Sequence, residues 1–239
     1  MLLAQNYSAE DDEAHIRALL PALRDPRYIR VDGRPLLLIY RIGHMPDPAA
    51  TIARWRSEVK KAGLPGLFLC NVESVNEDHG RAASLDLDAA VEFAPDWHRL
   101  PEPMQRGRRN AVKYLLRNRT LRPRAFVDHY VVPYSALAAT MVAKPEPPYA
   151  RFPAVTPMWD NTARRKTGGY VMAESSPEVY AEWLRHAISR VAHRPPDQRL
   201  VFINAWNEWA EGNHLEPCQR WGRAYLEATR SALESAAAG

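Results

Sequence analysis

The sequence predicts an α/β fold built on a parallel sheet. Short apolar runs alternate with helical segments from end to end of the 239-residue chain, as in parallel α/β proteins. Hydrophobic residues make up 46% of the sequence, which is enough for a core. Polar and aromatic residues follow each apolar run, where such sheets gather functional groups. We therefore predict one domain over residues 1–239, with a site at the carboxyl ends of its strands.

The predicted helices begin and end at recognisable signals. Ser8 is a favoured N-cap, and acidic residues follow it in the first turn. A Gly-Leu-Pro-Gly sequence at 63–66 ends the second helix, and Pro177 suits the first turn of the third. We predict four main helices, over residues 9–24, 48–62, 177–193 and 221–236.

The predicted strands are short apolar runs rich in strand-forming residues. The last of them follows a break at Pro195-Pro196. Residues 2–4 are a candidate edge piece. We predict five core strands, over residues 36–40, 67–72, 89–93, 152–158 and 200–205.

Composition argues against several classes of protein. No window approaches an 18-residue apolar span, so we expect no membrane span, and no signal peptide is visible. Two cysteines argue against a disulfide framework and favour a cytoplasmic location. The net charge is +4, and residues 99–124 carry nine bases and one acid. This basic run is typical of a solvated face, with phosphate or acidic polysaccharide binding as the alternative. Because no nucleic-acid-binding motif accompanies it, we expect no nucleic-acid partner.

Residues 200–217 are the most informative part of the chain. Polar and aromatic residues crowd the end of the last predicted strand: Asn204, Trp206, Asn207, Glu208, Trp209, Glu211, His214 and Glu216. Carboxylates act as acid and base on glycosidic bonds, indole faces stack on sugar rings, and amides and imidazoles bind hydroxyls. We interpret this segment as a carbohydrate site. The alternative is a surface turn without a function.

The other predicted strands also end in polar or aromatic residues: Tyr40, Arg41, Asn71, Glu73, Glu92, Asp96, Trp159, Asp160 and Asn161. A shared binding cleft explains this recurrence better than separate coincidences. Three of these residues have structural alternatives. Arg41 can serve as an ion-pair partner, Glu92 as a buried, salt-bridged support, and Asp160 as the cap of the turn that follows it.

Three stretches of the chain resemble one family of enzymes. The motif W-N-E-W-x-E-G-x-x-x-E-P at residues 206–217 is similar to the last strand and loop of the family-99-like glycoside hydrolases. It is closest in pattern to a bacterial branch labelled as glycosyltransferases of O-antigen and polysaccharide clusters. Residues 27–41 and 157–162 resemble further strands of that branch, in the same order.

The family has a (β/α)8 barrel, so the resemblance implies this architecture. Residues 1–7 resemble the segment after the third strand of the family, which predicts an incomplete barrel of about the last five β/α units. An open arc leaves unpaired strand edges and an uncovered apolar face. We therefore expect self-association through open sheet edges, or marginal stability.

The resemblance also implies a mechanism. The residues that match the catalytic pair of the family are Glu208 and Glu211. Glu208 would deprotonate the sugar 2-hydroxyl, which attacks C1 to give a 1,2-anhydro sugar and overall retention. Glu211 would protonate the leaving oxygen and later activate water. Glu211 then needs a raised pKa, which packing against Trp206 or Trp209 would supply.

Several roles stay open at this stage. Glu216 either binds a substrate hydroxyl or orients the loop. His214 and the nearby carboxylates lack metal-ligand spacing, so we expect no metal and no cofactor. Cys218 is a weak candidate for a nucleophile, and Cys70 is expected to be buried.

We predict a retaining glycoside hydrolase or transglycosylase that acts on an oligosaccharide or polysaccharide of mannose type or a related type. The first alternative is a glycosyltransferase of cell-surface (O-antigen) polysaccharide biosynthesis. The second is a truncated, non-catalytic remnant.

Overall fold

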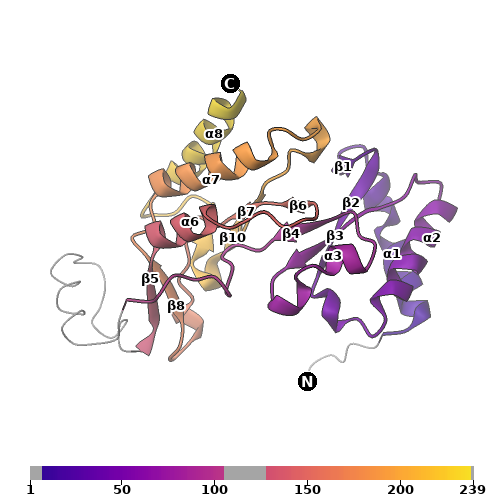
Figure 1. Cartoon of the computed structure of the whole chain (residues 1–239), viewed down its shortest axis with the longest axis horizontal. Coiled ribbons are helices and arrows are strands. Elements are labelled where there is room, and N and C mark those ends of the chain that lie inside the picture. The colour runs from indigo at the N-terminus through magenta and orange to yellow at the C-terminus, as the bar shows by residue number, and fades with distance from the viewer. Residues whose placement is uncertain (1–6, 105–127, 238–239) are drawn as a thin grey trace. The chain divides into compact units, whose positions relative to one another are not determined.

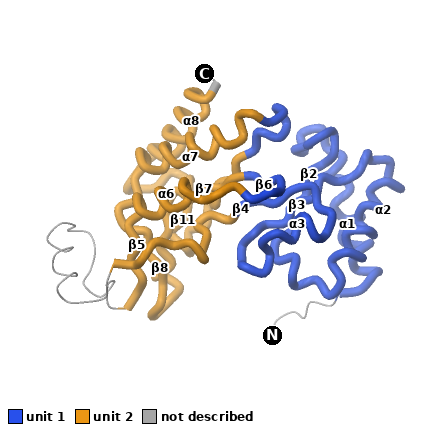
Figure 2. The backbone as a smooth tube through the Cα atoms, viewed as in Figure 1, with its two compact units in different colours: residues 1–92, 147–152, 194–200 blue, residues 93–146, 153–193, 201–239 orange. Residues whose placement is uncertain are grey.

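The computed structural model describes residues 7–104 and 128–237 (Figure 1). The chain divides into two compact units, which we describe one at a time (Figure 2). Unit 1 comprises residues 1–92, 147–152 and 194–200, and unit 2 comprises residues 93–146, 153–193 and 201–239. The candidate edge piece at residues 2–4 and the basic run beyond residue 104 lie outside the described residues.

Unit 1 contains an open five-stranded sheet in the order β1-β2-β3-β4-β6. Its strands are β1 (Arg30–Val31), β2 (Arg34–Tyr40), β3 (Phe68–Glu73), β4 (Ala89–Glu92) and β6 (Arg151–Phe152). β2, β3, β4 and β6 run parallel, whereas β1 is antiparallel to β2. The register brings the carboxyl ends of neighbouring strands together, because Tyr40 pairs with Val72 and Glu73 pairs with Glu92.

The helices of unit 1 begin at side-chain caps. Its helical elements are α1 (Ala9–Arg24), η1 (Ile42–His44), α2 (Pro48–Lys61), η2 (Asn76–Asp78), α3 (Arg81–Ser84) and η4 (Pro196–Gln198). The Ser8 hydroxyl accepts a hydrogen bond from the Asp11 N–H at 3.1 Å, and Asp47 caps α2 in the same way. α1 and α2 pack together, and their apolar sides share a core with Ile39 of β2 and Leu69 of β3.

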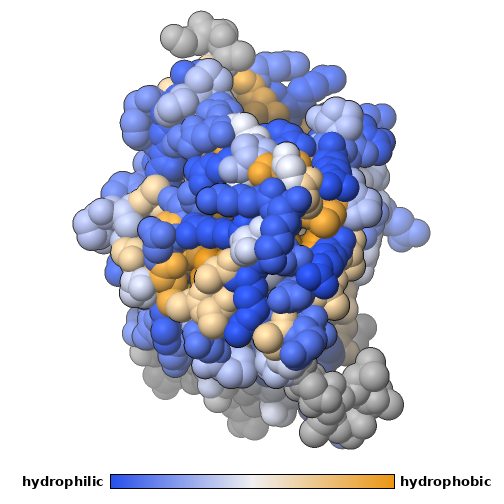
Figure 3. Space-filling view, turned by 90° about the vertical axis from the view of Figure 1, so that its right-hand side faces the viewer, coloured by the Kyte–Doolittle hydropathy of each residue, from blue (hydrophilic) through white to orange (hydrophobic). Residues whose placement is uncertain are grey.

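One face of β2 is exposed toward the carboxyl end of the strand. Successive side chains of a strand point to opposite faces, so Leu38 and Tyr40 lie on the face opposite Ile39. Leu38 and Tyr40 are 38% and 57% exposed, whereas Ile39 is 4% exposed. Figure 3 shows a largely hydrophilic side of the molecule on which hydrophobic residues gather in small groups. An uncovered strand face is what an open sheet predicts; self-association through it stays a prediction.

Unit 2 is built from short strand pairs and three α-helices in its described residues. β5 (Tyr130–Pro133) runs parallel to β8 (Tyr170–Ala173), and β7 (Ala154–Val155) runs parallel to β9 (Phe202–Ile203). β10 (Asn207–Glu208) and β11 (Asn213–His214) form an antiparallel pair. The helical elements are α6 (Tyr134–Val142), η3 (Thr162–Arg164), α7 (Pro177–Val191), η5 (Trp209–Glu211) and α8 (Ala224–Ala237). α7 packs against α6 and α8 around an apolar core that contains Leu137, Val155 and Leu184.

The α/β class and most of the predicted elements are confirmed. The predicted strand over 152–158 is wrong as a single element: β6 and β7 flank Pro153 and pair with different strands. Proline lacks the N–H group that would continue the ladder. The last strand is shorter than predicted, the closing helix begins at Ala224 rather than at residue 221, and β5, α6 and β8 were not predicted. Within residues 7–104 and 128–237, no helix is both long and apolar enough to cross a membrane.

Candidate functional site

Residues 207–214, which belong to the segment richest in polar and aromatic side chains, fold into a tight hairpin in unit 2. β9 leads to Trp206, and β10 then pairs with β11 so that Asn207 faces His214 and Glu208 faces Asn213. The Trp206 carbonyl accepts from the N–H groups of Leu215 and Glu216, at 2.9 and 3.1 Å, which closes the base of the hairpin. η5 forms its tip. The hairpin therefore holds Glu208 and Glu211 at two ends of one short turn.

A second segment, after β7, anchors the hairpin. The Asp160 N–H donates to the Glu211 carbonyl at 2.8 Å. Gly212 follows with φ of 55°, a left-handed conformation that favours glycine. A Cβ atom at Gly212 would lie 2.8 Å from the Asp160 carbonyl oxygen, so only glycine fits against this backbone. The position of Glu211 is thus fixed by its own backbone and by a tight contact that no larger residue allows.

Glu211 has the environment expected of a group that holds its proton. Burial raises the pKa of the Glu211 carboxyl, Arg164 counteracts this, and the negative charge of Glu208 raises the pKa further. The Arg164 guanidinium lies 3.0 Å from the Glu211 carboxylate, and its own side chain is 54% exposed. The predicted direction of the pKa shift is confirmed. Its main cause is burial, and the charge of Glu208 shows that the two carboxylates interact.

Trp209, His214 and Glu216 form one assembly on the hairpin. The Trp209 indole stacks on the His214 ring with a centroid distance of 3.7 Å and an angle of 18° between the planes. Its Nε1–H donates to the Glu216 carboxylate at 2.6 Å. Burial lowers the pKa of His214, and the Glu216 charge opposes this shift. Of the two roles considered for Glu216, these contacts favour orientation of the loop, through Trp209.

The exposed tryptophans leave aromatic surface free for a ligand. Trp206 is 52% exposed and Trp209 is 49% exposed. Large aromatic surfaces of this kind are suited to the apolar faces of sugar rings. Asn207 is exposed on the same hairpin. The hairpin thus presents both stacking surfaces and polar groups beside its two carboxylates.

Other predicted site residues of unit 2 have structural partners. The Asn161 side-chain oxygen accepts from the Tyr170 N–H at 2.8 Å, and the Asn204 amide donates to the Ala94 carbonyl at 2.7 Å. Asp160 accepts from the N–H and the hydroxyl of the residue two positions on, which confirms the turn cap considered for it. Trp159 is buried, with its ring edge-on to Trp97 at 4.9 Å between centroids.

The remaining predicted residues belong to unit 1. Tyr40 is exposed, and the Arg41 guanidinium lies over its ring at 5.4 Å. Both residues line a pocket of about 350 Å³ that also contains Asp11, His15, His44 and Trp55. Arg41 has a left-handed backbone, with φ of 62°.

Asn71 and Glu73 lie at the carboxyl end of β3, inside unit 1. Asn71 is fully buried and donates to the Asp78 carbonyl at 2.8 Å. Glu73 accepts hydrogen bonds from the Tyr149 hydroxyl at 2.5 Å and the Gly80 N–H at 3.2 Å. These internal bonds occupy the polar groups of Glu73, and its predicted role in substrate binding stays a prediction.

The buried guanidinium of Arg151 links two carboxylates in unit 1. It lies 3.4 Å from Glu73 and 3.7 Å from Glu92. Glu92 is 6% exposed, so the interpretation of this residue as a buried, salt-bridged support is confirmed. Asp96, in unit 2, forms a comparable buried ion pair with Lys144 at 2.7 Å.

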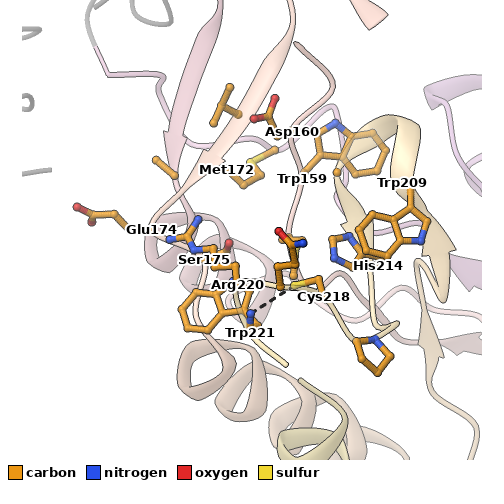
Figure 4. A pocket seen from close by; sticks show the side chains of 16 residues that line it. Trp159, Asp160, Met172, Glu174, Ser175, Trp209, His214, Cys218, Arg220 and Trp221 are labelled. Atoms are coloured by element: carbon orange, nitrogen blue, oxygen red, sulfur yellow. Dashed lines mark hydrogen bonds between the residues drawn. The ribbon is translucent and has the colours of Figure 1, made fainter. Parts of the chain in front are cut away.

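Beside the hairpin, unit 2 contains a pocket of about 630 Å³ (Figure 4). Its walls come from Met158–Asp160, from the end of β8 and the turn after it, and from the hairpin with the segment that follows. The turn residues Glu174 and Ser175 were not predicted as site residues because β8 itself was missed. Trp221 was assigned to a helix that in fact begins at Ala224, and Arg220 was not singled out in the sequence.

Among residues 7–104 and 128–237, no three His, Cys, Asp or Glu side chains gather as metal ligands would. Cys70 is fully buried, as expected, and burial raises the pKa of its thiol. The Cys218 sulfur accepts from the Trp221 N–H at 3.4 Å.

An interacting carboxylate pair between half-exposed tryptophans, where a parallel strand ends, is typical of carbohydrate-active proteins. Residues 1–229 match the family described as Glycosyltransferase WbsX, and the chain therefore belongs to that family.

Curated relatives extend well beyond this chain. Two proteins, each called Uncharacterized protein WxcX, come from Xanthomonas campestris pv. campestris strains ATCC 33913 and B100. Each is 39% identical over 237 residues, which is 99% of this chain and 32% of the relative. The chain thus spans about a third of the length of the curated relatives it matches.

Solved structures share the fold. A glycoside hydrolase-like protein matches with a TM-score of 0.58 and 14% identity, over 93% of this chain and 60% of that protein. The GH99 endo-alpha-mannosidase from Bacteroides thetaiotaomicron in complex with BIS-TRIS-Propane matches with a TM-score of 0.54 and 15% identity. That match covers 98% of this chain and 67% of the mannosidase. The prediction of a fold that corresponds to part of a (β/α)8 barrel is confirmed.

Proposed function

We propose that this chain carries the acid–base groups of a retaining glycoside hydrolase or transglycosylase that acts on a mannose-type or related polysaccharide. The observation that supports this most directly is the pair on the hairpin, in which burial and the charge of Glu208 raise the pKa of Glu211. A carboxyl group with a raised pKa holds its proton at a higher pH than an ordinary one does. That proton is what a leaving glycosidic oxygen needs.

Glu208 is the proposed base. Among residues 7–104 and 128–237, no Lys, Arg or His forms an ion pair with Glu208, which lies in β10 opposite Asn213 of β11. In the proposed reaction it removes the proton of the sugar 2-hydroxyl, the 2-oxygen attacks C1, and the C1–O bond to the leaving group breaks as Glu211 gives up its proton. A water molecule then opens the 1,2-anhydro ring: Glu211, now ionised, takes a proton from that water as its oxygen bonds to C1, the bond between C1 and the 2-oxygen breaks, and Glu208 returns its proton to the 2-oxygen.

The two roles predict different responses to a substrate with a good leaving group. A glycosyl fluoride needs no protonation of its leaving group, so it should restore much of the first step in Glu211→Gln but none in Glu208→Gln. On an α-manno-oligosaccharide, both variants should lose about 10²- to 10⁴-fold in rate. Glu227→Gln, an exposed change on α8, is the matched control and should keep full activity. A full rate in either hairpin variant would contradict the proposal.

A glycosyltransferase is the second candidate, and the description of the family favours it. Such an enzyme would use an activated sugar as donor, and the cytoplasmic location expected from the sequence suits that chemistry. The discriminating measurement is protection of the chain against heat or protease by ligands. Protection by nucleotide sugars alone would favour the transferase, and protection by oligosaccharides alone would favour the hydrolase. Protection by neither would favour the non-catalytic alternative.

A further inference from the structure

The pocket beside the hairpin is separate from the carboxylate pair but borders it. Its wall contains Asp160 and Gly212, and not Glu208 or Glu211. The Asp160 N–H nevertheless bonds to the Glu211 carbonyl, and Gly212 follows Glu211 directly. A molecule in this pocket would therefore contact Gly212, the residue that follows the proposed acid in the chain. It would also lie beside Trp209 and His214, whose stacked rings line the pocket (Figure 4).

The lining of the pocket has surfaces of the kind that bind sugar rings. Three indoles, of Trp159, Trp209 and Trp221, line it. The Arg220 guanidinium lies over the Trp221 ring at 4.9 Å. Hydrogen-bonding side chains complete the lining: Asp160, Glu174, Ser175, Gln219 and Arg220. Aromatic faces interleaved with carboxylate, amide and guanidinium groups match the alternating apolar and hydroxyl surfaces of a pyranose.

The pocket is also lined by two methionines, Met158 and Met172, which are 9% and 3% exposed and belong to the apolar core of unit 2. A hydroxyl group placed against these two side chains would find no hydrogen-bonding partner on them. A sugar with a methyl group would instead bury that methyl group against two methionines. Burial of one such group favours binding by about fourfold.

We propose that this pocket is a subsite for a sugar residue that carries a methyl group, either a 6-deoxyhexose or an acetamido sugar, and that it flanks the bond on which the carboxylate pair acts. The second part of this inference rests on the proposed function. The first part, selective binding of a methyl-bearing sugar, stands on the lining of the pocket alone.

Methionine methyl groups provide a direct test. The chain labelled with ¹³C at its methionine methyl groups is titrated by NMR with three matched pairs: L-rhamnose and L-mannose, L-fucose and L-galactose, and N-acetylglucosamine and glucose. The signals of Met158 and Met172, assigned by Met→Leu variants, should shift with at least one methyl-bearing sugar. Met45 in unit 1 and Met141 in α6 lie outside the pocket and should not shift.

The expected selectivity is a binding constant about fourfold or more in favour of the methyl-bearing member of a pair. A response to a 6-deoxyhexose or to the acetamido sugar identifies which methyl source the pocket takes. Trp159→Phe replaces an indole of the lining with a smaller ring that has no N–H, and it should weaken binding by roughly twofold to tenfold. Trp183→Phe removes an indole N–H from α7 outside the pocket, and it should leave the affinity unchanged.

Equal binding within every pair, or no shift at Met158 and Met172, would overturn the inference. These outcomes are distinct from failure of the proposed function. If Glu211→Gln abolishes turnover while the methionine signals stay still, the function stands and the subsite falls. If the signals shift but neither glutamate affects turnover, the subsite stands and the proposed chemistry falls.

Discussion

Gly212→Ala tests the claim that a backbone contact fixes the position of Glu211. A Cβ atom at Gly212 would meet three atoms of Asp160: the carbonyl oxygen at 2.8 Å, Cβ at 3.1 Å and the backbone nitrogen at 3.2 Å. Two of these are backbone atoms that cannot turn aside as a flexible side chain would. The substituted chain must therefore move the hairpin, with loss of the hydrogen bond from Asp160 to the Glu211 carbonyl.

The cost has two parts that a control can separate. Alanine at a left-handed position costs about 1–2 kcal/mol of unfolding free energy whatever surrounds it. Forcing a methyl group into a packed contact adds about 1–3 kcal/mol. Gly222 has φ of 53°, close to the 55° of Gly212, yet a Cβ there would meet nothing within 4 Å. Gly222→Ala should therefore lose only the first part, and Gly212→Ala should lose both.

Urea unfolding followed by tryptophan fluorescence measures the difference in stability between the two variants in unit 2, where both glycines lie. Six of the seven tryptophans belong to unit 2, so fluorescence reports mainly on that unit. We expect Gly212→Ala to be about 1–3 kcal/mol less stable than Gly222→Ala. Gly212→Ala should also lower the rate of the carboxylate chemistry more than Gly222→Ala does. Equal losses in stability and rate would refute the idea that this contact holds Glu211.

Three further substitutions probe the charges of unit 2. Arg164→Met removes a positive charge that lowers the pKa of Glu211, so the pKa should rise and the alkaline limb of the pH–rate profile should move to higher pH. Glu216→Gln removes a negative charge that raises the pKa of His214, so the His214 ring should titrate at lower pH by NMR, and the Trp209 indole N–H signal should shift. Lys144→Met removes the ammonium group that pairs with the buried Asp96 carboxylate, and the free energy of unfolding measured in urea should fall by about 3–5 kcal/mol.

Each of these substitutions has a matched control on an exposed surface. Arg185→Met on α7 removes the same charge as Arg164→Met and should leave the pH–rate profile in place. Glu227→Gln should not change the His214 titration. Arg230→Met breaks an ion pair whose side chains are 75% and 70% exposed, and it should cost about 0–1 kcal/mol. If a control changed the measured quantity as much as its test variant does, the role assigned to the test residue would be contradicted.

The helices were predictable wherever a local signal marked an end. Ser8 and Pro177 fixed the starts of α1 and α7, because cap and first-turn preferences depend on the chain's own backbone. α6 was missed although its buried residues Tyr134, Leu137, Ala138 and Met141 recur at helical spacing. It has no side-chain cap at its start, and a largely apolar segment gives little contrast between its faces.

The strands of unit 2 were less predictable because tertiary pairing decides where they begin and end. The apolar run at 152–158 has the composition of one strand, yet the chain changes partner at Pro153, from β4 to β9. Such a change depends on which strands lie alongside. Two-residue strands such as β9 and β10 contain too few residues for any alternation to show.

The segment that carries the candidate site was predictable from the sequence, but the contacts of its residues were not. The hairpin residues were found because three carboxylates and two tryptophans at a strand end have no use in a core. Arg164 and Asp160 contact Glu211 from a segment about 50 positions earlier in the chain, and no local sequence pattern predicts these contacts. The raised pKa of Glu211 was expected from the role assigned to it, whereas the guanidinium that limits the rise was not.

The predicted binding residues fall into a buried group and an exposed group, which are suited to different roles. Asn71, Glu73 and Asn161 are less than 5% exposed, and the side chain of each forms a hydrogen bond within its own unit. A ligand would have to break those bonds to use them, so their polar groups are better explained as supports for the strand ends. Trp206 and Trp209 are about half exposed and can stack on a sugar without any such loss. In unit 2, we therefore expect a ligand to contact the exposed aromatic surface of Trp206 and Trp209 rather than the side chain of Asn161.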